Sequence, residues 1–374
     1  MPGLPDQIEV TKPQASTWGK GDSKETTEMF DRLLEAEKTS SGIVVNSFEE
    51  LEPKYVEAFA RAKDKVVWCI GPVSLSNKSF EDLSERGNKP AINKDDCLKW
   101  LDSREQGSVV YVCLGSLWYG STEQAIELGL GLESSNKPFI WFIRQTSDEF
   151  ERWLLEEGYE ERIKDRGLMV RGWAPQILIL SHEAIGGFIT HCGWNSTLEG
   201  ICAGIPMVTW PHFADQFLNE RFIVDVLKIG VKIGILSRCT EQTSENSMAS
   251  PHHTDLHFVL FPLMAQGHLI PMVDMARILA QRGAIVTIVT SPVNAKRFKP
   301  VIDRAIEAKL QIQFLELPLP LDEVGLPEGC ENFDLLPSHA HALNMYSAMS
   351  MLENPAEILL KTLCTPPSCI ISES

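Results

Sequence analysis

Short β-rich runs alternate along this sequence with longer amphipathic segments, and this alternation restricts the chain to a narrow class of folds. Helical periodicity occurs at residues 123–133, 174–181, 197–203 and 215–227. Strands that alternate with helices form parallel βαβ units. The sequence therefore predicts an α/β protein with an open, doubly wound, mainly parallel sheet. The predicted strands of this first series are residues 42–46, 66–70, 108–114, 139–143, 168–171, 187–190 and 205–210.

A polar segment ends the first series, and a second series follows it. Residues 236–254, LSRCTEQTSENSMASPHHT, are rich in Ser and Thr and lack an apolar period, which predicts a linker. We therefore expect two domains, residues 1–235 and 255–374. The second series has predicted strands at 257–263, 284–290, 311–315 and 369–374, helices at 271–282, 294–308 and 340–363, a turn at 266–268 and a long loop at 318–337.

The composition points to a small-molecule partner. The 374 residues are 44% hydrophobic and 23% charged, which is enough to bury the cores of two ordinary domains. The formal net charge of −17 argues against binding to nucleic acid or to an anionic membrane, because both depend on clustered Lys and Arg. No apolar run reaches the length of a membrane span, and no signal peptide is recognisable. The nine cysteines include no CxxC pair, so we expect reduced thiols and a cytoplasmic location.

The stretch THCGWNSTLEG, residues 190–200, lies where a predicted strand gives way to a helix. A helix that begins just after Gly193 offers unpaired backbone N–H groups and the positive end of its dipole. Asn195 and Ser196 add side-chain donors to this first turn, and His191 is a further donor. Gly193 also allows the backbone to approach an anion closely. The stretch therefore predicts a phosphate site.

Other polar and aromatic residues follow neighbouring predicted strands and extend this site. Glu199 is an acceptor suited to sugar hydroxyls, and Trp173 offers a stacking face for a base. Asp215 and Gln216 follow another strand and can bond a second sugar. Because open α/β sheets bind ligands at the carboxyl ends of their strands, we expect a nucleotide diphosphate with a sugar attached.

Residues 173–216, WAPQILILSHEAIGGFITHCGWNSTLEGICAGIPMVTWPHFADQ, resemble the donor-binding signature box of plant family 1 UDP-sugar glycosyltransferases. The resemblance implies that Trp173 stacks on uracil, while the Ala174 backbone and Gln176 hold the base and ribose. It further implies that Glu199 binds the ribose hydroxyls, that His191, Asn195 and Ser196 hold the pyrophosphate, and that Trp194, Asp215 and Gln216 face the transferred sugar.

The final residue of the box and several upstream motifs add detail to the resemblance. In this family a terminal Gln, here Gln216, usually accompanies glucose. The segments NSFEELEP, IGPVSL, CLKWLDS and SVVYVCLGSL are also similar to the family. Ser116 in the last of these is expected to be another phosphate contact, although it can equally cap a nearby helix. The family has the GT-B fold of two Rossmann-like domains, which we expect here.

The second part of the chain resembles the opposite end of the same family. The segment HFVLFPLMAQGHLIPMVDMARIL is similar to the family's amino-terminal strand, turn and helix, in which a His is the general base. The resemblance assigns this role to His268, and an imidazole suits it because its pKa lies near working pH. The family orients this His with a buried Asp, and the matching position here is Glu373, which can also be a solvated terminal carboxylate. Met272 and Met275 are expected to be core residues of the helix.

The order of the two halves differs from the family. The donor-binding half comes first, and an incomplete acceptor-binding half follows it. Two pieces are missing by comparison with the family: the acceptor-domain segment between Ser374 and Met1, and the end of the donor domain after Ile235. This pattern suggests a join between two neighbouring related genes, or a rearranged and trimmed gene.

The resemblance implies a metal-independent, inverting transfer of glucose from UDP-glucose to a hydroxyl of a small apolar acceptor such as a flavonoid, another phenolic or a terpenoid. The partners expected are thus a UDP-sugar and a hydrophobic acceptor, and the oligomeric state is left open. An alternative is an inactive remnant or fusion that binds UDP-sugar, or pairs with an intact homologue, without catalysis. A third possibility is that missing strands leave apolar surface exposed and cause aggregation.

Overall fold

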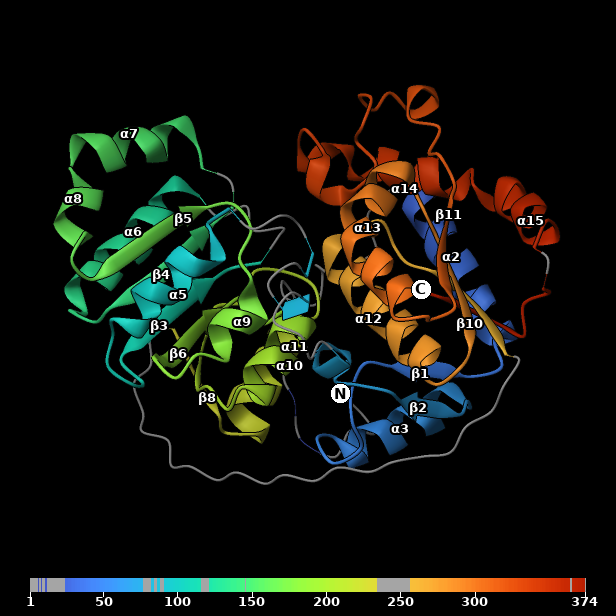
Figure 1. The fold of residues 1–374 in the computed structure, drawn as a ribbon, viewed down its shortest axis with the longest axis horizontal. Helices are drawn as coiled ribbons and strands as arrows, with labels where there is room; N and C mark the ends of the chain where they lie inside the picture. The colour runs from blue at the N-terminus through green and yellow to red at the C-terminus, as the bar shows by residue number, and fades with distance from the viewer. Residues whose placement is uncertain are drawn as a thin grey trace. The chain divides into compact units, whose positions relative to one another are not determined.

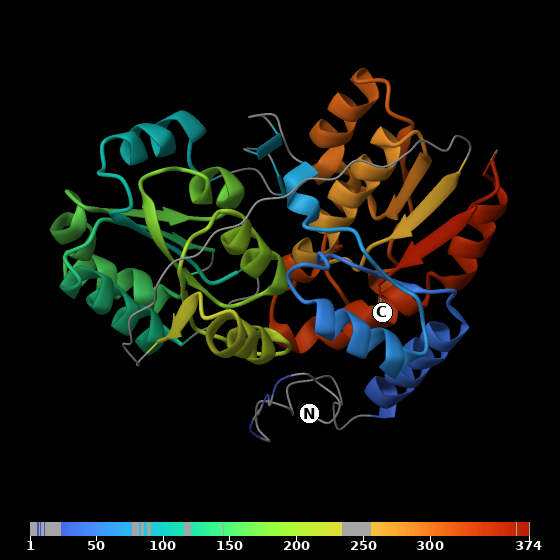
Figure 2. The same ribbon diagram turned by 90° about the horizontal axis from the view of Figure 1, so that it is seen from below.

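The computed structural model describes residues 6, 8, 11, 24–76, 82–83, 86–87, 91–115, 121–144, 146–233, 256–363 and 365–373 (Figures 1 and 2). The predicted linker, residues 236–254, lies outside them, as does Ser116. The chain divides into two compact units, each assembled from separate stretches of sequence. The first contains the described residues of Met1–Lys20, Glu52–Ala62 and Lys89–Ser244, and the second those of Gly21–Leu51, Lys63–Asn88 and Glu245–Ser374.

The first unit is built on a sheet of six parallel strands. They lie in the order β5-β4-β3-β6-β7-β8, so the chain starts in the middle, winds to one edge and then winds to the other. This is the doubly wound topology that the sequence predicted, with its change of direction between β3 and β6. The sequence did not predict β8, because three residues are too few to show a periodicity. The strands are β3 (Val109–Cys113), β4 (Phe139–Ile143), β5 (Gly167–Arg171), β6 (Ile185–Thr190), β7 (Met207–Thr209) and β8 (Gly230–Lys232).

Helices cover both faces of this sheet. The helices of the first unit are α3 (Pro53–Lys63), α5 (Lys94–Asp102), α6 (Thr122–Ser134), α7 (Asp148–Glu156), α8 (Tyr159–Ile163), α9 (Gln176–Leu180), α10 (Trp194–Cys202) and α11 (Gln216–Arg221). The last continues into a π-helical turn, η2 (Phe222–Val226). Side chains of α6, α7 and α8 join one buried cluster, and side chains of α5 and α9 join another.

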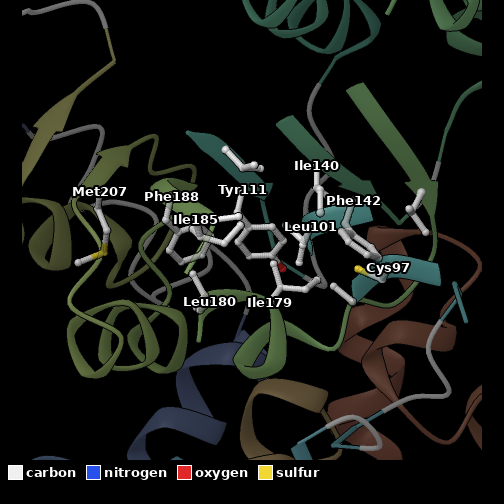
Figure 3. Close-up of a cluster of buried hydrophobic side chains, with 14 of the residues drawn as sticks. Cys97, Leu101, Tyr111, Ile140, Phe142, Ile179, Leu180, Ile185, Phe188 and Met207 are labelled. Carbon is white, nitrogen blue, oxygen red and sulfur yellow. The ribbon is translucent and has the colours of Figure 1, made fainter. Parts of the chain in front are cut away.

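The two clusters lie on opposite faces of the sheet because successive side chains of a strand point in opposite directions. In β4, Phe139 and Trp141 belong to the first cluster, whereas Ile140 and Phe142 belong to the second. Figure 3 shows Tyr111 and Phe188 side by side in the second cluster, where their rings stack with centroids 5.1 Å apart. This cluster supports the strands β3 and β6, from which the candidate site extends.

The second unit has a smaller parallel sheet of the same kind. Its order is β11-β10-β9-β12, so the chain again changes direction next to its first strand, between β9 and β12. A separate pair of parallel strands, β1 and β2, comes from the early part of the sequence. The strands are β9 (His257–Phe261), β10 (Ile285–Thr290), β11 (Ile312–Glu316), β12 (Cys369–Ser372), β1 (Ile43–Val45) and β2 (Val67–Cys69).

Two long helices of the second unit each follow a strand of its sheet, α12 (Gln266–Gln281) after β9 and α13 (Pro292–Glu307) after β10. The predicted loop at 318–337 contains short 3-10 turns, and the predicted helical stretch at 340–363 is divided in two. The other helical elements are α2 (Lys24–Thr39), α14 (Ala342–Ser350) and α15 (Glu353–Lys361), with the short turns η1 (Val73–Ser76), η3 (Asp322–Val324), η4 (Phe333–Leu335) and η5 (His339–His341).

The predicted start of α12 is wrong. The sequence indicated a turn at 266–268 and a helix from Pro271, but the helix begins at Gln266 and Pro271 lies inside it. Leu269 and Ile270 are buried, so the apolar face of the helix extends in front of the proline. Burial of these two side chains offsets the backbone hydrogen bond that a proline cannot donate. The prediction that Met272 and Met275 are core residues is confirmed.

Buried ion pairs tie the early part of the sequence to the late part within the second unit. The Asp82 carboxylate contacts Arg277 of α12 at 2.5 Å and Arg304 of α13 at 3.2 Å. Arg86 contacts Asp274 of α12 at 2.8 Å. Both carboxylates are buried, which makes these pairs sensitive to loss of either partner. The segment that includes Asp82 and Arg86 therefore belongs with α12, nearly two hundred residues further along the chain.

Two general expectations concern the described part of the chain. The described cysteines are free thiols, at positions 69, 97, 113, 192, 202, 330 and 369. Among the described helices, none combines the length and apolar character needed to cross a membrane.

Candidate donor and catalytic sites

The first candidate site lies where the sheet of the first unit changes direction. The loop after β3 begins with Leu114 and Gly115, and the loop after β6 contains His191 and Gly193. A Cβ atom on Gly115 would lie 2.5 Å from Nε2 of His191, and one on Gly193 would lie 2.4 Å from the same atom. Gly115 also has a φ of +83°, which disfavours other residues. The imidazole thus occupies space that only glycines at both positions leave open.

His191 is neutral at pH 7 in this environment. Burial, together with the nearby His212, lowers the pKa of His191 to about 4, while a hydrogen bond to the backbone of Cys113 acts in the opposite direction. Its Nδ1 atom is buried and has no hydrogen-bond partner among the described residues. A bound phosphate would favour the protonated imidazole, because an anion stabilises an adjacent cation. The neutral imidazole keeps one N–H donor, so His191 can donate to a phosphate without taking up a proton.

The amino terminus of α10 is the second part of this site. Its N-cap residue is Gly193, and no side chain caps the helix there. Trp194, Asn195 and Ser196 form the first turn, so the backbone donors of this turn and the two polar side chains are close together. A nine-residue helix with an uncapped amino terminus can hold an anion such as a phosphate.

Three of the predicted donor contacts form a single hydrogen-bonded cluster. The amide Nε2 of Gln176 donates to Ser196 Oγ at 2.9 Å and to Glu199 Oε2 at 2.8 Å. The hydroxyl of Tyr111 donates to Oε1 of the same amide at 3.1 Å. Glu199 is buried, and the contact with Gln176 satisfies one of its oxygens. The cluster joins α9 to α10, where Glu199 offers acceptors for ribose one turn beyond the donors for phosphate at the start of α10.

Trp173 and Ala174 precede this cluster, in the connection from β5 to α9. The Trp173 carbonyl accepts a hydrogen bond from Ala91 N–H at 3.0 Å, and the side chain is partly buried. Ala174 is buried, and its carbonyl accepts from Gln176 N–H at 2.9 Å. These bonds fix the backbone at the carboxyl end of the strand, where a base could stack on the indole.

The predicted sugar contacts lie around the beginning of α11. Asp215 is the exposed N-cap residue of the helix, and Gln216 is buried with its Oε1 atom accepting from the backbone N–H groups of His212 and Phe213. The Trp194 ring packs against Phe222, with centroids 6.1 Å apart. Gln216 therefore holds the loop before α11, while Asp215 presents its carboxylate to solvent.

The second unit brings His268 and Glu373 together, again where its sheet changes direction. His268 lies in the first turn of α12, which follows β9, and Glu373 follows the neighbouring strand β12. Nδ1 of His268 is 3.0 Å from Oε2 of Glu373. The same carboxylate oxygen accepts a hydrogen bond from Leu263 N–H at 3.0 Å, which holds it in place. The imidazole is about half exposed (48%), so its ring is accessible to a substrate.

Comparison with known proteins identifies the chain. Residues 82–243 match the family model described as UDP-glucoronosyl and UDP-glucosyl transferase. UDP-glycosyltransferase 73C4 of Solanum lycopersicum is 58% identical over 235 residues, which cover 63% of this chain and 68% of that protein. This chain belongs to the UDP-glycosyltransferase family. UDP-glycosyltransferase 73E1 of Stevia rebaudiana is 64% identical over 239 residues, which cover 64% of this chain and 48% of that protein. The chain thus spans about half the length of most of the curated relatives it matches.

A solved relative supports the fold of this chain. The structure of Glycyrrhiza uralensis UGT73P12 complexed with glycyrrhetinic acid 3-O-monoglucuronide has a TM-score of 0.57 and 30% sequence identity. The match covers 83% of this chain and 62% of that one. The α/β architecture with mainly parallel sheets is of the GT-B type, as the sequence predicted.

The sequence missed several residues that shape these candidate sites. Tyr111 and Gly115 belong to the β3 strand and its loop, and nothing in the local pattern marks them. His212 lowers the pKa of His191 from another loop. Asn219 bonds Asp215 across one helical turn, and the i,i+4 spacing of two polar residues could have indicated this pair. The ligand roles of the predicted site residues remain predictions.

Proposed function

We propose that this UDP-glycosyltransferase transfers glucose from UDP-glucose to a hydroxyl of a small apolar acceptor, with inversion at the anomeric carbon. The observation that carries the proposal is the 3.0 Å contact between His268 Nδ1 and Glu373 Oε2 at the carboxyl edge of the second sheet. A carboxylate in this place orients the ring and stabilises its protonated form, as in other His-carboxylate pairs. The chemistry needs a general base of this kind.

In the proposed reaction the ring nitrogen of His268 that does not contact Glu373 takes the proton of the acceptor hydroxyl. The acceptor oxygen forms a bond to the anomeric carbon of glucose as the bond from that carbon to the phosphate oxygen breaks. The electron pair of the broken bond leaves with UDP. Attack and departure occur on opposite faces of the carbon, so the configuration inverts. Glu373 remains ionised and stabilises the imidazolium that forms.

The donor site in the first unit supports the choice of a UDP-sugar. The uncapped amino terminus of α10 and His191 suit the pyrophosphate, and the buried Glu199 beside Gln176 suits the ribose hydroxyls. Trp173 offers its ring to uracil. The proposed sugar is glucose, because Gln216 ends the signature box. An acceptor of the flavonoid, phenolic or terpenoid class is proposed, and the related structure that binds a glycyrrhetinic acid glucuronide supports an apolar one.

The test compares transfer with binding in single variants. His268→Ala is expected to abolish glucose transfer to a panel of phenolic and terpenoid acceptors, while the Kd for UDP measured by calorimetry stays unchanged. Glu373→Gln should lower kcat strongly without changing that Kd, because it keeps the hydrogen-bond acceptor and removes the charge. The control is His182→Ala, since His182 forms a similar pair with Asp102 at 3.1 Å in the first unit and lies before β6, at the other end of that strand from His191.

Three outcomes would overturn the proposal. Unchanged turnover in His268→Ala would exclude the assigned base. UDP binding by the wild type without transfer to any acceptor would favour a non-catalytic UDP-sugar binder. A higher rate with UDP-galactose than with UDP-glucose would refute the proposed sugar.

We also propose that the transfer needs no metal ion, so addition of EDTA should leave the rate unchanged.

A further inference from the structure

Asn219 connects the two loops that carry the proposed diphosphate and sugar contacts. It lies on α11, and its side chain is buried at 9% exposure. The amide nitrogen Nδ2 donates to the carbonyl of Cys192 at 2.9 Å and to Oδ2 of Asp215 at 2.8 Å. One amide group thus uses both of its N–H bonds to hold two separate segments of the chain.

Both segments contain backbone in a conformation that needs support. Cys192 has a φ of +65° and Ala214 has a φ of +53°, a region that side chains other than glycine rarely adopt. Such residues persist where their surroundings hold them, and they occur often at binding sites. Asn219 donates one hydrogen bond to the carbonyl of Cys192 and another to the carboxylate of Asp215, the residue that follows Ala214. Thr190 Oγ1 adds a bond to Cys192 N–H at 3.2 Å.

The positions of these two segments determine what each can bind. Cys192 lies between His191 and Gly193, so the orientation of its carbonyl fixes the peptide that leads into the first turn of α10. Asp215 is exposed, and Asn219 engages only its Oδ2 atom from the protein side. Removal of the amide would release the Cys192 carbonyl and the Asp215 carboxylate from these two hydrogen bonds.

We propose that Asn219 is a positioning residue of the donor site, which holds the diphosphate loop at Cys192 and the sugar contact Asp215 in register with each other. This inference rests on the proposed function, because it takes the diphosphate and the sugar as the groups that these loops bind. Asn219 itself contacts neither group and acts through its two hydrogen bonds.

The experiment measures the affinities of UDP and of uridine by calorimetry or competition. Uridine has no phosphate and depends on Trp173, Gln176 and Glu199. Asn219→Ala is expected to weaken UDP binding roughly tenfold, the scale of one or two lost hydrogen bonds, and to leave uridine binding within about twofold. Asn219→Asp keeps the size but replaces the donor with a carboxylate beside Asp215, so it should weaken UDP at least as much.

A matched control is Asn332→Ala in the second unit. Asn332 is also a buried amide, and its Nδ2 donates to Asn294 Oδ1 at 2.8 Å. This variant should lower the melting midpoint without changing the ratio of UDP to uridine affinity. A general loss of folding therefore differs from the selective loss that positioning predicts.

The outcomes separate this inference from the proposed function. If wild-type protein binds UDP no better than uridine, the diphosphate site itself is wrong. If wild type prefers UDP and Asn219→Ala keeps that preference, Asn219 does not position the loop. An equal loss of UDP and uridine affinity would indicate a structural role alone and would also refute the inference. Should Asn219→Ala fail to fold, Asn219→Asp measured below its melting transition decides.

Discussion

Gly193→Ala tests whether the imidazole of His191 determines which residue can precede α10. The new Cβ atom would lie 2.4 Å from Nε2 of His191, about 1 Å closer than an ordinary contact. The φ of Gly193 is −59°, which alanine adopts freely, so the cost is not backbone strain. The imidazole has little room to move, because its Nε2 atom already lies beside Gly115.

The expected loss of stability follows from this overlap. Insertion of a methyl group into a filled site costs about 1–3 kcal/mol, and alanine is a poorer N-cap residue than glycine by up to about 1 kcal/mol. Displacement of the ring and of the first turn of α10 should also weaken UDP binding roughly tenfold. The control is Gly187→Ala in β6, where no described atom lies within 4 Å of the new Cβ; we expect a change within about 0.5 kcal/mol.

The assay is urea unfolding followed by tryptophan fluorescence, with and without UDP. Because two units can unfold separately, the transition that shifts with UDP identifies the first unit. A double-mutant cycle with His191→Ala isolates the clash, since removal of the ring should abolish most of the cost of Gly193→Ala. The reasoning is refuted if Gly193→Ala and Gly187→Ala have the same midpoint, or if the cost persists in full without the imidazole.

Three further predictions concern stability. Asp82→Ala should destabilise the second unit by about 3–5 kcal/mol because it leaves Arg277 and Arg304 without this buried partner. Asp303→Ala, which breaks the exposed pair with Lys299, should change the free energy of unfolding by less than about 0.5 kcal/mol in the same denaturant titration. Tyr55→Ala should destabilise the first unit by about 1–2 kcal/mol, because it removes the edge contact with the Phe222 ring, whose centroid is 5.6 Å away. Tyr55→Phe loses only the hydrogen bond to Asp6 and should cost at most about 1 kcal/mol. Equal losses for the two variants in a denaturant titration would contradict this prediction. Burial is the main reason that the pKa of His191 and that of His212 are both lowered to about 4. Between about pH 6.5 and pH 4 these two side chains are therefore protonated in the unfolded chain but neutral in the folded protein. The free energy of unfolding thus falls as the pH drops through this range. Melting curves should show a smaller pH dependence in His191→Asn, and an unchanged one would contradict the assignment.

Apart from β8, the strands of both sheets were predictable because buried parallel strands carry apolar runs that stand out in the sequence. Phe139–Ile143 was predicted to the residue, since all five side chains are buried. The start of α12 was not predictable, because Pro271 masked a helical face that only the burial of Leu269 and Ile270 makes clear. The three residues of β8 were missed because their pairing with β7 depends on the sheet already being formed.

The sequence by itself determined the α/β class and the family, and it predicted the residues that we propose to bear the chemistry, because these depend on local patterns and on a long run of matching residues from Trp173 to Gln216. Tertiary structure decided how those residues meet. The contact between His268 and Glu373, the cluster of Gln176 with Ser196 and Glu199, and the bond from Asn219 to Cys192 join segments that no local period relates. The strand order places the ends of separate strands at one edge of each sheet, and burial there sets the pKa of His191. Such effects arise only when distant parts of the chain pack together, because hydrogen bonds and desolvation depend on distance in space and not on distance in sequence.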